Sequence, residues 1–155
     1  MLDPDSVALL EGGCALIVGT VAADGTPHAT RGWGLTVLDR DPIRIRLVIS
    51  AEEQALANLD ATGRLAVTAA DVPTLRSLQL KGRVAAVEPM TDADRDTVGR
   101  YTDAMFTDIE RTDGAPRLVL ERWRALAHVV CEVEVDEWFD QTPGPGAGAP
   151  LVRRP

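Results

Sequence analysis

The sequence predicts a mainly β (β+α) protein, in which about six antiparallel strands form a small closed or partly closed barrel with peripheral helices. Three observations favour this fold. Several segments of strand length alternate apolar with polar residues, a strong hairpin signal follows the first of them, and the helical patterns fall between the third and fourth strands and before the last. The 155 residues have the length of a single domain.

The first part of the chain predicts a short helix and three strands. Asp3 can accept a hydrogen bond from a free amide at a helix start, Pro4 suits the first turn, and Gly12 ends the helix. The pair Asp24-Gly25 favours a hairpin, because both residues tolerate the positive φ of a tight turn. The three expected antiparallel strands cover residues 14–23, 26–39 and 43–50.

The middle of the chain predicts a helix between strands. Ser50 and Glu53 have the S-x-x-E spacing of a capping box, and the helix after them ends near Gly63. In the strand expected at residues 74–87, Leu78, Leu80 and Val84 share one face, while the other carries Ser77, Gln79, Lys81 and Arg83. The two strands expected here cover residues 64–71 and 74–87.

The last part predicts two helices, a closing strand and a tail. Thr91 and Asp94 repeat the capping pattern before a helix to about Thr112, and a second amphipathic helix is expected at 116–126. Residues 128–139 alternate cleanly and close the sheet. We therefore expect a domain at residues 1–140 and a tail at 141–155, whose Pro and Gly content predicts neither a helix nor a strand ladder.

Composition excludes several classes of protein. A net charge of −8 argues against wholesale binding of nucleic acid, which needs clustered Lys and Arg. No apolar run approaches the length of a membrane span, and the acidic start does not match a secretory signal, so we expect a soluble, cytoplasmic protein. Cys14 and Cys131 lie far apart in apolar runs and are expected to be buried thiols, with no metal site.

No familiar catalytic template is present in the sequence. There is no G-x-S-x-G elbow, no P-loop and no G-x-G-x-x-G between a strand and a helix. His28 and His128 each begin a predicted strand without a metal-spaced partner, which favours ordinary histidines at strand edges. Hydrolytic and metal-dependent chemistry are therefore not expected, and the catalytic residues stay unassigned.

Two polar strand faces stand out instead. Arg31 and Trp33 share one face of the second strand with Leu35 and Val37, and Ser77, Gln79 and Lys81 share one face of the fifth. Together they offer positive charge, an aromatic plane and hydrogen-bonding groups, which suit a flat, partly anionic ligand. On composition alone, a face that simply meets water or a second copy is the simpler interpretation.

The order of these segments resembles the FMN-binding split barrels of the pyridoxamine 5'-phosphate oxidase-like superfamily, over roughly residues 8–139. The matching segments are GTVAADGTPHATRGWGL, LVISAEEQALANLDATGRLAVTAAD and RSLQLKGRVAAV. The resemblance implies a six-stranded antiparallel split β-barrel with peripheral helices. It also implies a homodimer that binds FMN in a cleft at the subunit interface.

The resemblance also assigns residues. Arg31 would match the arginine that approaches the flavin phosphate or ribityl chain, and Ile49 and Ser50 would lie near the phosphate. Trp33 would shape the ring pocket. The polar face of the fifth strand would supply Ser77, Gln79 and Lys81.

One departure from the family pattern concerns the phosphate. Where FMN-binding members usually have an Arg-Lys pair after the third strand, this chain has Glu53 and Gln54. The expected function is a flavin-dependent oxidoreductase that acts on a small-molecule substrate. The alternative is a non-catalytic dimeric split-barrel protein that binds a deazaflavin, haem or no cofactor. Vitamin B6 oxidase activity is less favoured, because no arginine-histidine arrangement for pyridoxal phosphate is found in the tail.

Overall fold

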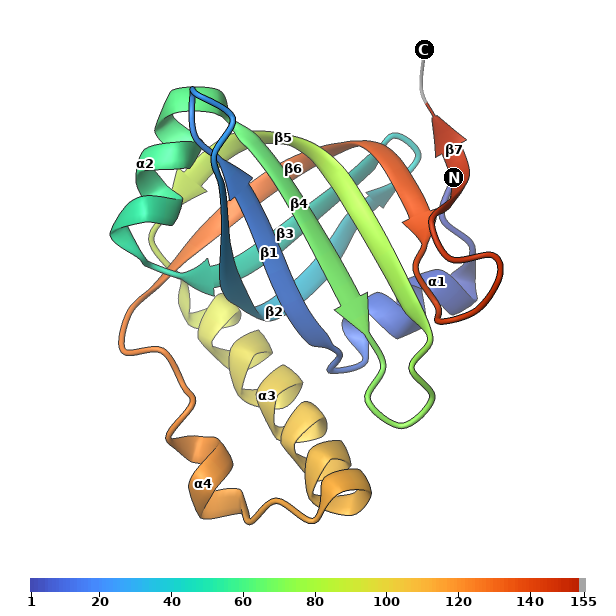
Figure 1. Cartoon of the computed structure of the whole chain (residues 1–155). Coiled ribbons are helices and arrows are strands. Elements are labelled where there is room, and N and C mark those ends of the chain that lie inside the picture. Colours follow the sequence, from blue (N-terminus) through green and yellow to red (C-terminus); the bar gives the residue numbers. More distant parts are fainter. Residues whose placement is uncertain (154–155) are drawn as a thin grey trace.

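The computed structural model describes residues 1–153 and confirms the predicted barrel (Figure 1). Its sheet has the strand order β3-β2-β1-β4-β5-β6-β7, and a further pairing of β3 with β6 closes six strands into a barrel. The strands are β1 (Ala15–Val21), β2 (Pro27–Arg40), β3 (Ile43–Ser50), β4 (Arg64–Ala70), β5 (Ser77–Glu88), β6 (His128–Asp140) and β7 (Ala149–Arg153). The helices are α1 (Pro4–Glu11), α2 (Glu53–Thr62), α3 (Asp92–Asp113) and α4 (Arg117–Glu121).

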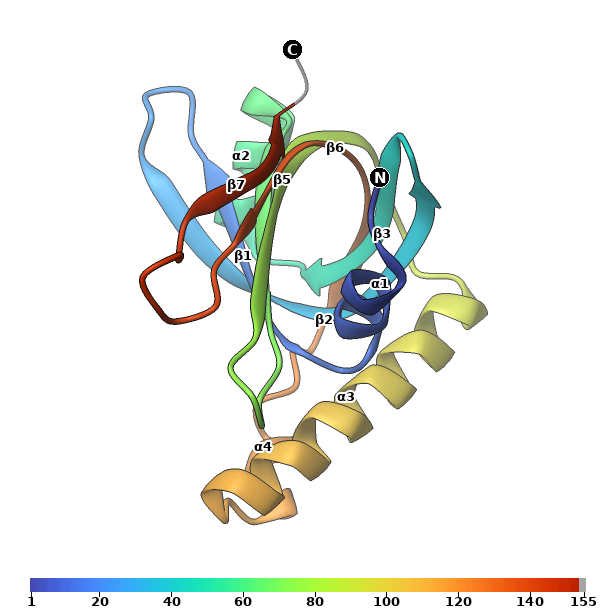
Figure 2. The same ribbon diagram turned by 90° about the vertical axis from the view of Figure 1, so that its right-hand side faces the viewer.

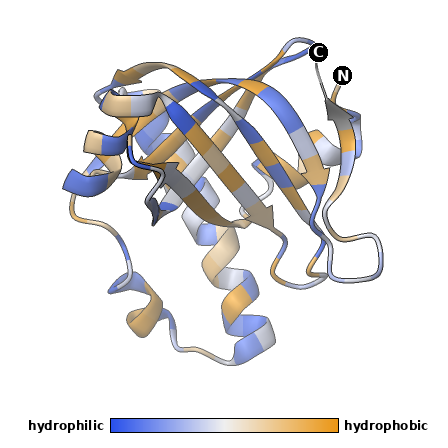
Figure 3. Ribbon diagram, turned by 45° about the horizontal axis from the view of Figure 1, so that its top comes forward, coloured by the Kyte–Doolittle hydropathy of each residue, from blue (hydrophilic) through white to orange (hydrophobic). Residues whose placement is uncertain are grey.

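Alternation of apolar and polar side chains fills the barrel interior. In β5, Leu78 and Leu80 are buried against the interior, while Lys81 and Arg83 are exposed on the outside. The alternation is visible as orange and blue segments along the strands in Figure 3. Since successive side chains of a strand point to opposite faces, one set builds the core and the other faces outward.

A bulge in β2 changes one expected face. Gly32 pairs with Ile49 and Gly34 with Val48, so Trp33 is an extra residue on the β2 side of the ladder. Trp33 therefore remains on the outer side, as Arg31 does, whereas Leu35 enters the barrel core. The prediction that Trp33 and Leu35 share a face was wrong, because strict alternation does not hold across a bulge.

A second apolar cluster lies outside the barrel, beneath α3 and α4. It contains Trp33 and Val48 from the strands, Phe106 from α3 and Leu120 from α4. Seen from the side in Figure 2, α1 and α3 lie on the opposite side of the barrel from β1. α1 and α3 thus lie away from β1, while α2 packs against β1, β2 and β4 at one end of the barrel; β1, β4 and β5 form the front in Figure 1 with no helix across them.

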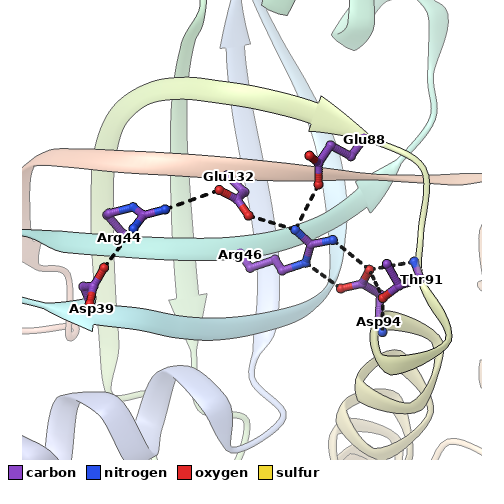
Figure 4. A network of polar contacts seen from close by, with 7 residues as sticks. All are labelled: Asp39, Arg44, Arg46, Glu88, Thr91, Asp94 and Glu132. Atoms are coloured by element: carbon purple, nitrogen blue, oxygen red, sulfur yellow. Dashed lines mark hydrogen bonds and ion pairs between the residues drawn. The ribbon is translucent and has the colours of Figure 1, made fainter.

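An ion-pair network joins the start of α3 to the barrel (Figure 4). The Arg46 guanidinium donates to both carboxylate oxygens of Asp94, at 2.7 and 2.9 Å, and also contacts Glu88 and Glu132 at 3.2 and 3.0 Å. Asp94 completes the predicted capping box with Thr91. Hydrogen bonds from Arg46 lower the pKa of Asp94 far below its ordinary value.

Two helix predictions need correction. The side chain of Ser50 does not cap α2, because Ser50 lies in β3 and Glu52 is the N-cap residue, without a side-chain capping bond. The helix expected at 116–126 is only the short α4, followed by turns up to β6. In the second half of the expected helix, Trp123 is 45% exposed and Leu126 is fully exposed, so few of its apolar side chains are buried to stabilise a longer helix.

The tail was expected to form no strand ladder, and this prediction was wrong. Residues 149–153 form β7, which pairs with the end of β6. Pro150 is tolerated because the register shifts between Trp138 and Phe139 at this point and because only β6 is paired with β7. Within the described part of the chain, no helix is both long enough and apolar enough to cross a bilayer.

Candidate functional site

The outward side of β1, β4 and β5 forms a continuous surface, here called the β1–β4–β5 face. One row of residues crosses it in register from β2 to β6. We call these residues the central row: Arg31, Ile17, Thr68, Gln79 and Phe139. Adjacent strands lie roughly 4.8 Å apart, so the backbones of Arg31 and Gln79 are about 14 Å apart in one chain. The two predicted polar faces therefore belong to one surface and occupy opposite ends of it.

The middle of this face is small and partly apolar. Ile17 is 49% exposed, and its neighbours Gly19, Ala66 and Ala70 leave the strands low and flat. A groove of about 360 Å³ begins beside Gly19 and Ala66 and extends to Lys81 and the end of β6. A flat surface with a shallow groove can accept a planar molecule or a second protein surface.

At one end of the central row, Arg31 is exposed. Its guanidinium carbon lies 5.5 Å from the centre of the Trp123 ring, over the ring face. Among the described residues, no carboxylate pairs with Arg31. Its positive charge is thus held in place by an aromatic ring and stays available to an anion.

At the other end, β5 supplies the remaining polar groups. The Lys81 ammonium lies 4.7 Å from the centre of the Phe139 ring, and no carboxylate of the described residues pairs with it. The side-chain NH2 of Gln79 donates to the Thr68 hydroxyl at 3.0 Å, and the side-chain oxygen of Gln79 accepts from the Gln141 amide at 3.5 Å. At or beside each end of the row there is therefore a cation that stacks on an aromatic ring and has no carboxylate partner within residues 1–153.

Four predicted residues, Trp33, Ile49, Ser50 and Ser77, are buried in the chain and offer little surface. Trp33 is 2% exposed, and its Nε1 donates to the Ser50 hydroxyl at 2.8 Å. Ile49 points its fully buried side chain into the barrel core. The Ser77 hydroxyl donates to the Leu75 carbonyl. Ser50 and Trp33 therefore form a buried pair beneath the surface that Arg31 occupies.

His128 lies beside this buried pair. Its ring meets the Trp33 ring edge-on, with the ring centres 6.0 Å apart. The Nε2 atom is buried and has no hydrogen-bond partner in the described chain. Burial lowers the pKa of His128, and the positive charge of Arg124 lowers it further. Both effects favour the neutral form of His128 next to Trp33.

The start of α2 is acidic rather than basic. The Glu52 carboxylate accepts from the Thr30 hydroxyl at 2.7 Å and lies 3.0 Å from Nε2 of His28. Glu53 follows as the first residue of α2. The helix N-terminus favours an anion, and here two carboxylates already supply the negative charge. A phosphate would meet repulsion at this place.

The arrangement thus suits a planar anion on the β1–β4–β5 face better than a phosphate at the start of α2. Sequence patterns found Arg31, Gln79 and Lys81, but they missed Trp123 and Phe139, the rings under the two cations. Only strand register and the turn after α4 bring these rings to the cations. Within residues 1–153, no group of three or more His, Cys, Asp or Glu side chains is arranged to hold a metal ion.

Comparison with known families gives a match over most of the chain. The family model described as pyridoxamine 5'-phosphate oxidase matches residues 2–141. No curated protein matches significantly.

Solved structures share the fold at low sequence identity. A putative pyridoxamine 5'-phosphate oxidase from Lactobacillus delbrueckii is 21% identical, with a TM-score of 0.56 over 89% of this chain and 93% of that one. An F420 reductase is 20% identical, with a TM-score of 0.56 over 84% and 93%. HutZ, described as the heme storage protein from Vibrio cholerae, is 14% identical, with a TM-score of 0.52 over 90% and 94%. At these identities the likeness concerns the fold alone.

Proposed function

Because this chain belongs to the pyridoxamine 5'-phosphate oxidase family, we propose that it is a flavin-dependent oxidoreductase that binds FMN on its β1–β4–β5 face. The observation that carries the proposal is the central row, with an unpaired cation near each end and a flat, half-exposed stretch between them. Donors and cations around a flat surface are what a planar anionic cofactor needs.

The proposal includes a homodimer. We consider a two-fold axis that lies in the plane of the face, runs parallel to the strands and passes between β1 and β4. Rotation about this axis would place β1 of one chain opposite β4 of the other, and β2 opposite β5. Arg31 of one chain would then face the β5 end of the central row, with Gln79, in the other chain. This arrangement would overcome the separation of about 14 Å between these two positions within one chain.

The residues present fit the ring and the negative charge of a flavin. Arg31 and Lys81 would hold anionic groups, and Gln79 has an amide that can donate to or accept from the ring edge. Ser50 and Trp33, whose buried hydrogen bond lies beneath α3 and α4, would hold β2 in place two residues along the strand from Arg31. When bound, a flavin supplies hydride-transfer chemistry, so the protein needs no acid-base constellation of its own.

The acidic start of α2 is the weakest part of the fit for FMN. Glu52 and Glu53 oppose a phosphate there, so the phosphate would have to lie near Arg31 or Lys81. A deazaflavin with its charge elsewhere is therefore the second cofactor to test, and one structural neighbour is an F420 reductase. Haem fits less well, since Nε2 of His128 is buried and Nε2 of His28 already contacts Glu52.

A flavin titration tests the proposal. We expect added FMN or F420 to bind, with quenched flavin fluorescence and a perturbed visible spectrum. The double variant Arg31→Ala, Lys81→Ala should weaken binding about a hundred-fold or more, because each lost charged contact costs on the order of 1.5–3 kcal/mol.

Arg95→Ala provides the matched control. Arg95 is an exposed arginine on α3 that pairs with Asp92, away from the face. It should leave flavin binding unchanged. If the wild-type protein binds neither flavin, or if the double variant binds as tightly as the wild type, the proposed site is wrong.

The second candidate function is a dimeric binding protein without redox catalysis, and the two carboxylates at the start of α2 favour it. It predicts that a flavin-loaded protein would not be reduced by a nicotinamide donor faster than free flavin. Stopped-flow absorbance of the bound flavin separates the two candidates.

A further inference from the structure

Exposed apolar side chains gather in one short segment beside the β1–β4–β5 face. The segment runs from α4 to the start of β6, and we call it the 118–127 segment. Leu118 is 71% exposed, Val119 44%, Trp123 45%, and Leu126 is fully exposed. Large apolar side chains gathered in this way mark a surface that a partner covers.

This segment is continuous with the proposed dimer face. Trp123 lies under the guanidinium of Arg31, and Arg31 is the cross-strand neighbour of Ile17 in the central row. In Figure 1 the connection from α4 to β6 runs along one flank of the face, and β7 lies on the other flank. The exposed apolar surface thus extends the central row past β2.

The opposite flank also exposes an apolar side chain. Beyond Gln79, the central row ends at Phe139, which pairs with Pro150 of β7. The next residue of β7, Leu151, is 47% exposed. β7 is the last strand of the sheet order, so its outer edge is unpaired within residues 1–153.

The two flanks match under the axis proposed for the dimer. An in-plane axis between β1 and β4 places the β2 side of one chain over the β5 side of the other. By the same operation, the 118–127 segment, which lies beyond β2, comes over the partner's β6–β7 hairpin, which lies beyond β5. An apolar surface would then meet an apolar surface on both sides of the axis.

We infer that the 118–127 segment clasps the β6–β7 hairpin of a second copy of this chain, with Trp123 and Leu126 packed against Leu151. The contact is made twice in the dimer, once at each end. The contact closes the Arg31 end of the cleft between the two subunits. It also gives the Pro- and Gly-rich tail a role in dimer assembly. The inference rests on the dimer proposed above but concerns a different surface.

Cysteine cross-linking tests the contact. The double variant Leu126→Cys, Leu151→Cys should form a disulfide-linked dimer upon mild oxidation with diamide, seen by non-reducing electrophoresis. Neither single variant should form this disulfide, because the two copies of position 126, and likewise the two copies of position 151, lie on opposite sides of the axis. The native cysteines do not interfere, since burial raises the pKa of both Cys14 and Cys131 to about 12.

Leu75 supplies the control position. It is 58% exposed on the turn between β4 and β5. Leu126→Cys combined with Leu75→Cys should give no cross-linked dimer. In addition, Leu126→Asp should raise the dimer dissociation constant at least ten-fold, whereas Leu75→Asp should leave it unchanged. Both leucines are exposed in the single chain, so neither change should impair folding.

The outcomes separate this inference from the proposed function. A wild-type dimer that cross-links through positions 126 and 151 supports both. A wild-type dimer that binds flavin but neither cross-links nor responds to Leu126→Asp overturns the clasp alone. A wild-type protein with the mass of one chain, 16.6 kDa, overturns the proposed dimer and the clasp together.

Discussion

The two sides of this barrel differ in how many of their charged side chains have a partner within the chain. On the α3 side, Arg46 contacts three carboxylates, and Phe106 is fully buried beneath Arg117 and Arg124. On the β1–β4–β5 face, Arg31 and Lys81 have no carboxylate partner among the described residues. The difference is consistent with our proposal, in which the first side stabilises the fold and the second binds a partner or ligand.

The largest expected effect tests the stabilising side. Phe106→Ala should lower the free energy of unfolding by about 3–5 kcal/mol, because it leaves a cavity between α3 and the barrel. In the dissociated single chain, where Ile17 on the open face is 49% exposed, Ile17→Ala should change it by less than about 0.5 kcal/mol. Urea unfolding measures both. Equal effects of the two changes would contradict the division into a stabilising and a binding side.

Acid should weaken the α3 side selectively. Because the pKa of Asp94 is lower in the folded than in the unfolded protein, the ionised carboxylate stabilises the fold at pH values above its ordinary pKa of 3.8. This stabilisation is lost as the pH falls below 3.8 toward the lower pKa of the folded state. Asp94→Asn should cost about 1.5–3 kcal/mol at pH 7 and much less at low pH.

Urea unfolding of the wild type and of Asp94→Asn across this pH range checks the prediction. The difference between the two proteins isolates Asp94 from other carboxylates with lowered pKa values, such as Asp24 and Asp140. A difference that stays constant with pH would show that the Arg46 pair is not its cause.

Ser50 distinguishes support from direct contact. If its hydroxyl mainly accepts from the buried Trp33 indole, Ser50→Ala should lower the free energy of unfolding by about 1–3 kcal/mol, because a buried donor loses its partner. Tryptophan fluorescence during unfolding measures this. An unchanged stability with a large loss of flavin affinity would instead make Ser50 a direct cofactor ligand.

The smallest expected effect comes from the start of α2. Glu53→Lys should change FMN binding by less than about two-fold, because the phosphate is proposed to lie near Arg31 or Lys81, while the loss of a favourable helix-dipole contact should cost about 0.3–1 kcal/mol of stability. Flavin titration and urea unfolding of the same variant measure the two effects. A several-fold gain in affinity would mean that the phosphate approaches α2 instead.

Much of the fold could be predicted from the sequence, because period-two alternation and capping residues act locally. The strands around Leu78 and Leu80, the α3 capping box and the α2 end at Gly63 all follow from short patterns. The Trp33 bulge could not be predicted, since it depends on how β2 aligns with β3. The pairing of β7 with the neighbouring end of β6 was missed because the Pro and Gly content of the tail argues against a strand, whereas an edge strand with a register shift tolerates Pro150.

The candidate site was only half visible in the sequence. Arg31, Gln79 and Lys81 could be found as polar residues on strand faces. The Trp123 and Phe139 rings could not, because a turn and a strand register bring them to the cations. Ser50 matched a capping motif in sequence, but its hydroxyl is used by Trp33 across the ladder instead.

The central claim is that the β1–β4–β5 face joins two chains around a flavin. Size-exclusion chromatography of the flavin-loaded protein, with light scattering to measure its mass, tests this claim most directly. We predict a wild-type mass of twice 16.6 kDa that coelutes with flavin absorbance. Ile17→Asp, which puts a charge at the centre of the face, should elute with the mass of one chain and without flavin. A wild-type protein that binds flavin as a single chain, or an Ile17→Asp protein that remains a flavin-bound dimer, would contradict the account.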